Sequence, residues 1–76
     1  MQAQNTYPRV IYNFIDTYWK EHGSAPSPDE IAQHIGLSDN TTRNYLQELQ
    51  SWGAIDWTPN KRRTIRITGE CPRVYT

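Results

Sequence analysis

The chain has 76 residues, enough for one small domain and fewer than the roughly 100–200 residues of a usual domain, which argues against a self-sufficient enzyme. Its one cysteine, Cys71, excludes an intramolecular disulfide and a cysteine zinc cluster, and no apolar run approaches the roughly 18 residues of a membrane span. Eight Lys and Arg side chains balance eight Asp and Glu, and this zero net charge argues at first sight against a nucleic-acid-binding protein.

The first element that we expect is a helix that begins near Pro8 and ends at Gly23. Proline fits the first helical turn, and glycine fits the left-handed residue that follows a helix. Apolar side chains recur between them in pairs every four residues, which is the period of an α-helix. These pairs are Val10 with Ile11, Phe14 with Ile15, and Tyr18 with Trp19. We therefore expect the aromatic rings of this stripe in the core, with stacking on nucleic-acid bases as the alternative.

A second, short helix is predicted to begin at Pro28. Ser27 is expected to cap its first turn, and Glu30 to reach back to the cap amide. Its buried face consists of Ile31, Ala32 and Ile35. Gly36 is expected to end this helix after about two turns.

A third helix is predicted from Asp39 to about Trp52, with Ser38 as its N-cap and Gly53 as its stop. Its buried stripe is expected to contain Thr42, Tyr45, Leu46, Leu49 and Trp52. Its opposite face carries Asn40, Thr41, Arg43, Asn44, Gln47 and Gln50. This face is unusual for a solvated helix, because it has amides and hydroxyls where Glu and Lys pairs are common.

After Gly53 the apolar residues alternate with polar ones, which predicts a β-hairpin with one face on the core. The alternating apolar residues are Ile55, Trp57, Ile65 and Ile67. Residues 59–63 between the two strands form a basic turn. Residues 69–76 are interpreted as a tail or an additional edge segment.

The charged residues are unevenly distributed along the chain. Residues 1–56 carry three Lys and Arg against seven Asp and Glu, a net charge of −4, and residues 57–76 carry five against one, a net charge of +4. Such asymmetry indicates an anionic partner for the basic segment. The alternative is a solvated hairpin that happens to be basic.

The order of the elements predicts an α+β fold, a winged helix-turn-helix in which a three-helix core is followed by a two-stranded β-hairpin wing. Two helices joined by a tight turn at residues 36–38 are typical of the helix-turn-helix motif. We expect this domain to span residues 7–68. In this motif the second helix of the pair enters the major groove of double-stranded DNA.

The predicted partner is therefore double-stranded DNA, read by the third helix over residues 39–52. Arg can bridge guanine, Asn or Gln can bridge adenine, and a Thr methyl can contact thymine. The candidates for base contacts are Asn40, Thr41, Arg43, Asn44 and Gln47. The candidates for contacts to the DNA backbone are Ser27, Ser38, Lys61, Arg62 and Arg63, the last three on the backbone or in the minor groove.

Two sequence patterns point to a known family. Residues Pro26 to Ala32 follow the pattern P-[ST]-x-x-E-I-A, and Leu46 to Ile55 follow L-x-x-L-x-x-x-G-x-I. Through them the stretch from Ala25 to Gly53 resembles the N-terminal DNA-binding domain of LexA repressors, and the resemblance extends over about residues 8–68. It implies a repressor-like transcriptional regulator that reads its operator from the start of the third helix.

The resemblance also has limits. The residues that match the operator-reading positions are Ser38, Asn40, Thr41, Arg43 and Asn44. The family usually has small and acidic residues where this chain has Thr41, Thr42 and Arg43, so the operator sequence is expected to differ. LexA repressors continue into a self-cleaving domain with a Ser–Lys dyad and the dimer contacts. Because no such domain is expected before Thr76, we interpret the chain as an excised domain or a stand-alone protein, and a response to DNA damage is not carried over.

Catalysis is not expected, and neither is a metal site or a cofactor. His22 is placed at a helix end, His34 on an exposed helix face, and Cys71 has no histidine near it in sequence. We expect a protein of the prokaryotic or phage type that works in the cytoplasm at the nucleoid, has no membrane partner, and pairs as a homodimer on two half-sites. The alternative function is a protein-interaction module that binds another chain through Trp57, Tyr75 and the hairpin.

Overall fold

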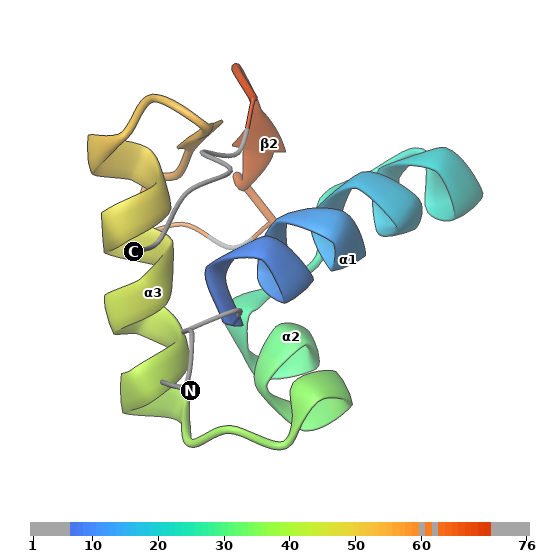
Figure 1. The fold of residues 1–76 in the computed structure, drawn as a ribbon. Coiled ribbons are helices and arrows are strands. Elements are labelled where there is room, and N and C mark those ends of the chain that lie inside the picture. Colours follow the sequence, from blue (N-terminus) through green and yellow to red (C-terminus); the bar gives the residue numbers. More distant parts are fainter. Residues whose placement is uncertain (1–6, 60, 62, 71–76) are drawn as a thin grey trace, which may run out of the picture.

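Three helices are followed by a two-stranded hairpin in the computed structural model, which describes residues 7–59, 61 and 63–70 (Figure 1). The helices are α1 (Tyr7–His22), α2 (Pro28–Ile35) and α3 (Asp39–Ser51). The strands are β1 (Ile55–Asp56) and β2 (Arg66–Ile67). This order confirms the predicted α+β winged helix-turn-helix fold.

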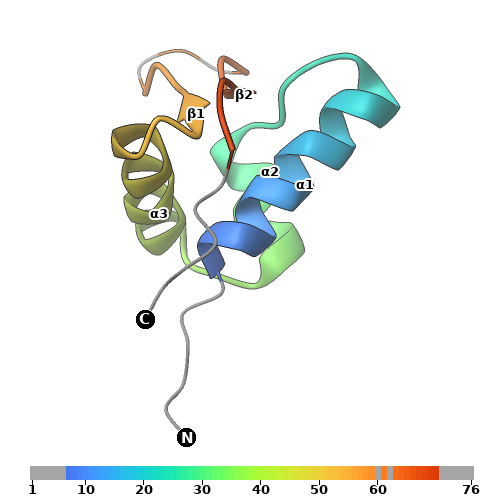
Figure 2. The same ribbon diagram turned by 45° about the horizontal axis from the view of Figure 1, so that its top comes forward.

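Helix α1 packs against both other helices and against β2 (Figure 2). Ile11 and Ile15 are completely buried, as their spacing predicts, and Phe14 is partly buried against the core. The prediction that the Trp19 ring lies in the core is wrong, because Trp19 is 36% exposed, and Val10 of the same apolar stripe is 41% exposed. The buried stripe is narrower than the apolar pattern, since the neighbouring elements cover only one side of the helix.

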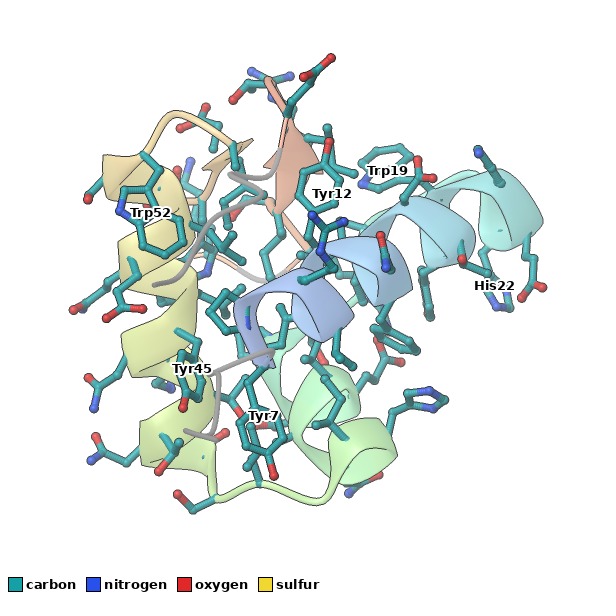
Figure 3. All side chains as sticks on the ribbon, in the orientation of Figure 1. Tyr7, Tyr12, Trp19, His22, Tyr45 and Trp52 are labelled. Atoms are coloured by element: carbon teal, nitrogen blue, oxygen red, sulfur yellow. The ribbon has the colours of Figure 1, made fainter. Side chains whose placement is uncertain are left out.

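Tyr12 and Trp19 connect α1 to the hairpin by hydrogen bonds from the polar ends of their rings. The Tyr12 hydroxyl donates to the Gly69 carbonyl at 2.6 Å, and Trp19 Nε1 donates to the Ile65 carbonyl at 2.9 Å. In Figure 3 both rings lie beside β2. An indole that must satisfy its N–H is favoured at the edge of a core, which accounts for the partial exposure of Trp19.

Helix α2 begins with the predicted capping box. The Glu30 amide donates to Ser27 Oγ at 3.2 Å, and the Ser27 amide donates to Glu30 Oε1 at 2.9 Å. Gly36 ends the helix with a φ of 88°, a left-handed conformation that favours glycine. Its amide donates to the Ala32 carbonyl at 2.8 Å, so the chain turns sharply toward α3.

Helix α3 begins at Asp39 after the predicted cap, in which Ser38 Oγ accepts a hydrogen bond from the Thr41 amide at 3.1 Å. Three residues of its expected buried stripe are completely buried: Thr42, Leu46 and Leu49. Trp52 was expected to complete this stripe, and that prediction is wrong. It is the C-cap residue, 41% exposed, at the point where the chain leaves the helix (Figure 3).

The hairpin is antiparallel, with Ile55 opposite Ile67 and Asp56 opposite Arg66. We call residues 55–67 the wing and residues 58–64 the wing tip. Trp57 and Ile65 are buried at the base of the wing, while β1 contacts α3 and β2 contacts α1. A Cβ on Gly69 would lie 2.5 Å from the Gly53 carbonyl oxygen, so a glycine is required where the chain passes the end of α3.

Candidate nucleic-acid interface

The sharp turn between α2 and α3 sets the angle of a helix-turn-helix pair. The left-handed Gly36 is followed by Leu37, which packs partly buried against the core, and by the capping residue Ser38. Because both ends of the turn are fixed by hydrogen-bonded caps and its centre is fixed by an apolar contact, α3 has a defined position relative to α2.

The side of α3 opposite the core is polar and accessible. Its exposed residues are Asn40, Asn44, Gln47 and Gln50, and its partly exposed residues are Thr41 and Arg43. The Arg43 guanidinium lies 3.4 Å from Asp39 Oδ2, one turn earlier on the same helix. The five expected base-contact residues are therefore all accessible on one helix, and their contacts to bases stay a prediction.

Two hydroxyls are held together at the start of α3. Ser38 Oγ accepts from the Thr41 amide and donates to Thr41 Oγ1 at 2.8 Å. The first turn also carries the acidic side chain of Asp39, and the amides at this end of the helix give it a partial positive charge. The positive helix end and the Thr41 hydroxyl favour contact with a phosphate, whereas the Asp39 carboxylate opposes it.

Ser27 is the least accessible of the residues expected to contact the DNA backbone. Its side chain belongs to the capping box of α2, and the residue is only 3% exposed. A direct contact between its hydroxyl and a phosphate would require the first turn of α2 to open. The contact stays a prediction, and Ser38 and Lys61 are more exposed candidates for it.

The wing tip is organised by hydrogen bonds across its base. The Thr58 amide donates to Thr64 Oγ1 at 3.0 Å, and this hydroxyl donates to the Thr58 carbonyl at 3.1 Å. Lys61 is exposed, and its amide donates to the Thr58 carbonyl at 3.0 Å. The expected contact of Arg62 falls outside the described residues.

Arg63 points back toward the start of α2, which the sequence did not predict. Its Nη1 donates to the Ala25 carbonyl at 2.9 Å and to Glu30 Oε1 at 3.2 Å, and its Nη2 donates to Glu30 Oε2 at 3.1 Å. Nη1 also lies 3.2 Å from the Tyr18 hydroxyl. The basic tip and the capping Glu30 were each visible in the sequence, but no local signal connects residues 33 positions apart.

Glu30 joins three parts of the molecule. Its carboxylate accepts from the Ser27 amide, from Arg63 and, at 3.4 Å, from the Tyr18 hydroxyl. The Ser27 hydrogen bond, together with the Arg63 guanidinium, lowers the pKa of Glu30 below its ordinary value, against the opposing effect of desolvation. The carboxylate is therefore the stable form at this junction.

The sequence also singled out two histidines and Trp57, and these side chains lie in ring contacts or in the core. His34 stacks on Phe14 with ring centroids 4.4 Å apart, and His22 lies 4.2 Å from Tyr18. Trp57 is only 3% exposed, so it is a core residue and does not form the surface that the interaction-module alternative requires. Cys71 and Tyr75 lie outside the described residues.

Within residues 7–59, 61 and 63–70, no three His, Cys, Asp or Glu side chains are grouped as a metal site. None of the described helices is long and apolar enough to cross a membrane.

The tight helix pair, the accessible polar face of its second helix and the hairpin that follows define a winged helix-turn-helix protein. Comparison with known proteins is consistent with this class. A model of the LexA DNA-binding domain matches residues 2–64, which is most of the chain. The chain therefore belongs to the LexA DNA-binding domain family.

Individual relatives agree with the family model. The LexA repressor of Pseudomonas aeruginosa is 42% identical over 70 residues, which cover 91% of this chain and 34% of the relative. That of Clostridium kluyveri is 37% identical over 67 residues, 87% of this chain and 33% of the relative. That of Carboxydothermus hydrogenoformans is 36% identical over 63 residues, which cover 82% of this chain and 31% of the relative. The chain thus spans about a third of the length of these relatives.

Proposed function

We propose that this chain binds double-stranded DNA sequence-specifically and acts in transcriptional repression. The observation that carries this proposal is the accessible, amide-rich face of α3, presented by a capped turn and flanked by a basic wing. A helix face that contacts only water is usually rich in Glu and Lys pairs. Base edges in the major groove, in contrast, offer donors and acceptors that match amides and hydroxyls. Membership of a repressor DNA-binding family supports the same conclusion.

In the proposed complex α3 lies in the major groove. Its base-contacting residues are Asn40, Thr41, Arg43, Asn44 and Gln47. Arg43 would leave Asp39 to bridge a guanine, since its present 3.4 Å contact is an exposed pair of the kind that contributes little to stability. The amides of Asn44 and Gln47 match the adenine edge.

The wing and the start of α3 hold the DNA backbone. The candidates for this role are Ser27, Ser38, Lys61, Arg62 and Arg63. Of the described ones, Ser38, Lys61 and Arg63 are exposed and Ser27 is buried. The Arg63 guanidinium is already engaged by Glu30. The zero net charge does not oppose this arrangement. It is the sum of an acidic body and a basic C-terminal segment, so nonspecific attraction should be modest and concentrated at the wing.

A single module of this size covers a limited area of DNA, roughly 600–1,000 Å² of protein surface. We therefore propose that two copies bind adjacent half-sites as a homodimer, one helical turn of DNA or a multiple of it apart. This repressor works in the cytoplasm at the nucleoid, without a membrane partner. The proposed role requires neither catalysis nor a cofactor.

A salt titration tests the proposal. Binding of the wild-type chain to a mixed-sequence duplex should weaken as salt rises, and Lys61→Ala should reduce the slope of log affinity against log salt by about 0.9. Lys20→Ala is the matched control, because it removes the same charge from an exposed position of α1 that is not a candidate for DNA contact. Absence of duplex binding even at low salt would contradict the proposal.

A further inference from the structure

The side chain of Arg63 is occupied before any DNA is bound. Two guanidinium nitrogens face the two Glu30 carboxylate oxygens at 3.2 and 3.1 Å, and one of them also donates to the Ala25 carbonyl at 2.9 Å. Such a paired arrangement is stronger and more directional than a single contact between charges. It connects the wing tip to the start of α2.

The backbone at Arg63 is adapted to this inward direction. Its φ of 57° makes it the non-glycine residue with a left-handed backbone in the described part of the chain. Residues that carry a Cβ rarely adopt this conformation, which is kept when the surrounding contacts stabilise it. The Arg63 side chain is 45% exposed, against 66% for Arg66, whose guanidinium lies 3.7 Å from Asp56.

We propose that Arg63 is a positioning residue, which holds the wing tip against the start of α2 through Glu30 and the Ala25 carbonyl, so that Lys61 faces the DNA backbone. This inference rests on the proposed function and deepens it. It gives Arg63 a different main role from that of Lys61, although the two residues belong to the same basic turn. Glu30 then serves the cap of α2 and the position of the wing at the same time.

The rival role for Arg63 is a direct phosphate contact. In that case Glu30 competes with the DNA for the guanidinium, and removal of the Glu30 charge strengthens binding. In the positioning role, the same removal releases the wing tip and weakens binding. The two roles therefore predict opposite signs for one substitution.

The first experiment measures the affinity of wild type and variants for a fluorescent duplex that wild type has selected from a random DNA pool. Glu30→Gln retains the capping box, since glutamine also serves at that position, but loses the paired charge. Arg63→Lys retains the charge but loses the planar fork that contacts two oxygens at once. We expect each variant to bind about threefold more weakly, the size of one exposed ion pair. Arg66→Lys is the matched control and should bind like wild type.

Two results would overturn the positioning role. One is tighter binding by Glu30→Gln, which means that the carboxylate competes with phosphate. The other is wild-type affinity for Arg63→Lys, which means that a charge alone is sufficient at this position.

A second measurement needs no DNA. Trp19 Nε1 donates to the Ile65 carbonyl, two residues after Arg63, so hydrogen exchange of this indole proton reports how firmly the wing lies against α1. Exchange should be about threefold faster in Glu30→Gln and Arg63→Lys and unchanged in Arg66→Lys. Unchanged exchange in both variants would overturn the positioning role.

The two measurements separate the possible failures. If the wild-type chain binds no duplex, the proposed function fails, and indole exchange still decides whether Arg63 holds the wing. If the duplex binds but exchange and affinity stay at wild-type values in Glu30→Gln and Arg63→Lys, only the positioning role fails.

Discussion

Completely buried Ile and Leu side chains hold the three helices together, whereas the wing tip is held by hydrogen bonds at the surface. The helices share a core that includes Ile11, Ile15, Ile31, Leu46 and Leu49. The wing has strands of two residues each, and its tip is tied by the Thr58–Thr64 contacts and by Arg63. Apolar burial depends little on the ions nearby, but exposed polar contacts exchange with water and with phosphate. The helices therefore form a fixed platform, and the wing is the part whose position can be tuned.

The largest expected effect comes from the platform. Leu46→Ala removes a completely buried side chain at the centre of α3 and should lower the free energy of unfolding by about 2–5 kcal/mol. Urea denaturation followed by circular dichroism measures this change. Gln47→Ala, on the exposed side of the same helix, is the control and should change stability by less than about 0.5 kcal/mol. Equal losses in the two variants would contradict the assigned orientation of α3.

The start of α3 should respond to loss of its cap. Ser38→Ala removes the oxygen that accepts from the Thr41 amide and should cost about 1 kcal/mol of unfolding free energy. Thermal unfolding detects a change of this size. Ser51→Ala at the other end of α3 removes the same hydroxyl without a cap and should be close to neutral. A Ser38→Ala variant as stable as wild type would mean that the cap does not fix the turn.

The junction between platform and wing should depend on pH. Because the folded state lowers the pKa of Glu30, its stabilisation is complete above the ordinary Glu pKa and is lost as the pH falls through the lowered value. Solvent screens this partly exposed group, so the loss should stay below about 1 kcal/mol. Urea unfolding between pH 6 and about pH 3 should show a shallower decline for Glu30→Gln than for wild type. If the stability of both proteins declined equally, Glu30 would not contribute to the acid sensitivity of the fold.

The smallest effect is expected at the edge of the apolar stripe of α1. Val10→Ala removes methyl groups from a residue that is 41% exposed and should change the unfolding free energy by less than about 0.5 kcal/mol. Its neighbour Ile11 is completely buried, and Ile11→Ala should cost about 2–5 kcal/mol. The same urea titration compares the two. A large loss for Val10→Ala would mean that this edge is covered by another part of the protein.

Much of the platform could be predicted because its signals are local. Ser27, Glu30 and Gly36 lie within ten residues of one another, and their spacing alone specifies where α2 begins and ends. The alternation of Ile55 with Trp57 similarly predicted a hairpin with one buried face. In such segments the nearest neighbours along the chain satisfy the backbone groups, so sequence is sufficient.

Features that depend on packing were harder to predict. The spacing of Val10, Trp19 and Trp52 places them at the edges of the apolar stripes of α1 and α3. Their exposure depends on how much of each helix the neighbouring elements cover, which the spacing does not specify. The contact of Arg63 with Glu30 joins residues from the hairpin and from α2, and only the folded chain brings them together. The candidate interface was therefore predictable in composition, but the inward direction of Arg63 was not.

Selection of bound sites from a random pool of duplex DNA, followed by sequencing, tests the central claim that the exposed face of α3 reads bases while the wing holds the backbone. The wild-type chain should enrich one motif, and Asn44→Ala should change the preferred base within it, with about 1–3 kcal/mol of discrimination lost there. Lys61→Ala should enrich the same motif with uniformly weaker binding. Enrichment of no motif by the wild-type chain, or an unchanged motif in Asn44→Ala together with a changed one in Lys61→Ala, would contradict the account.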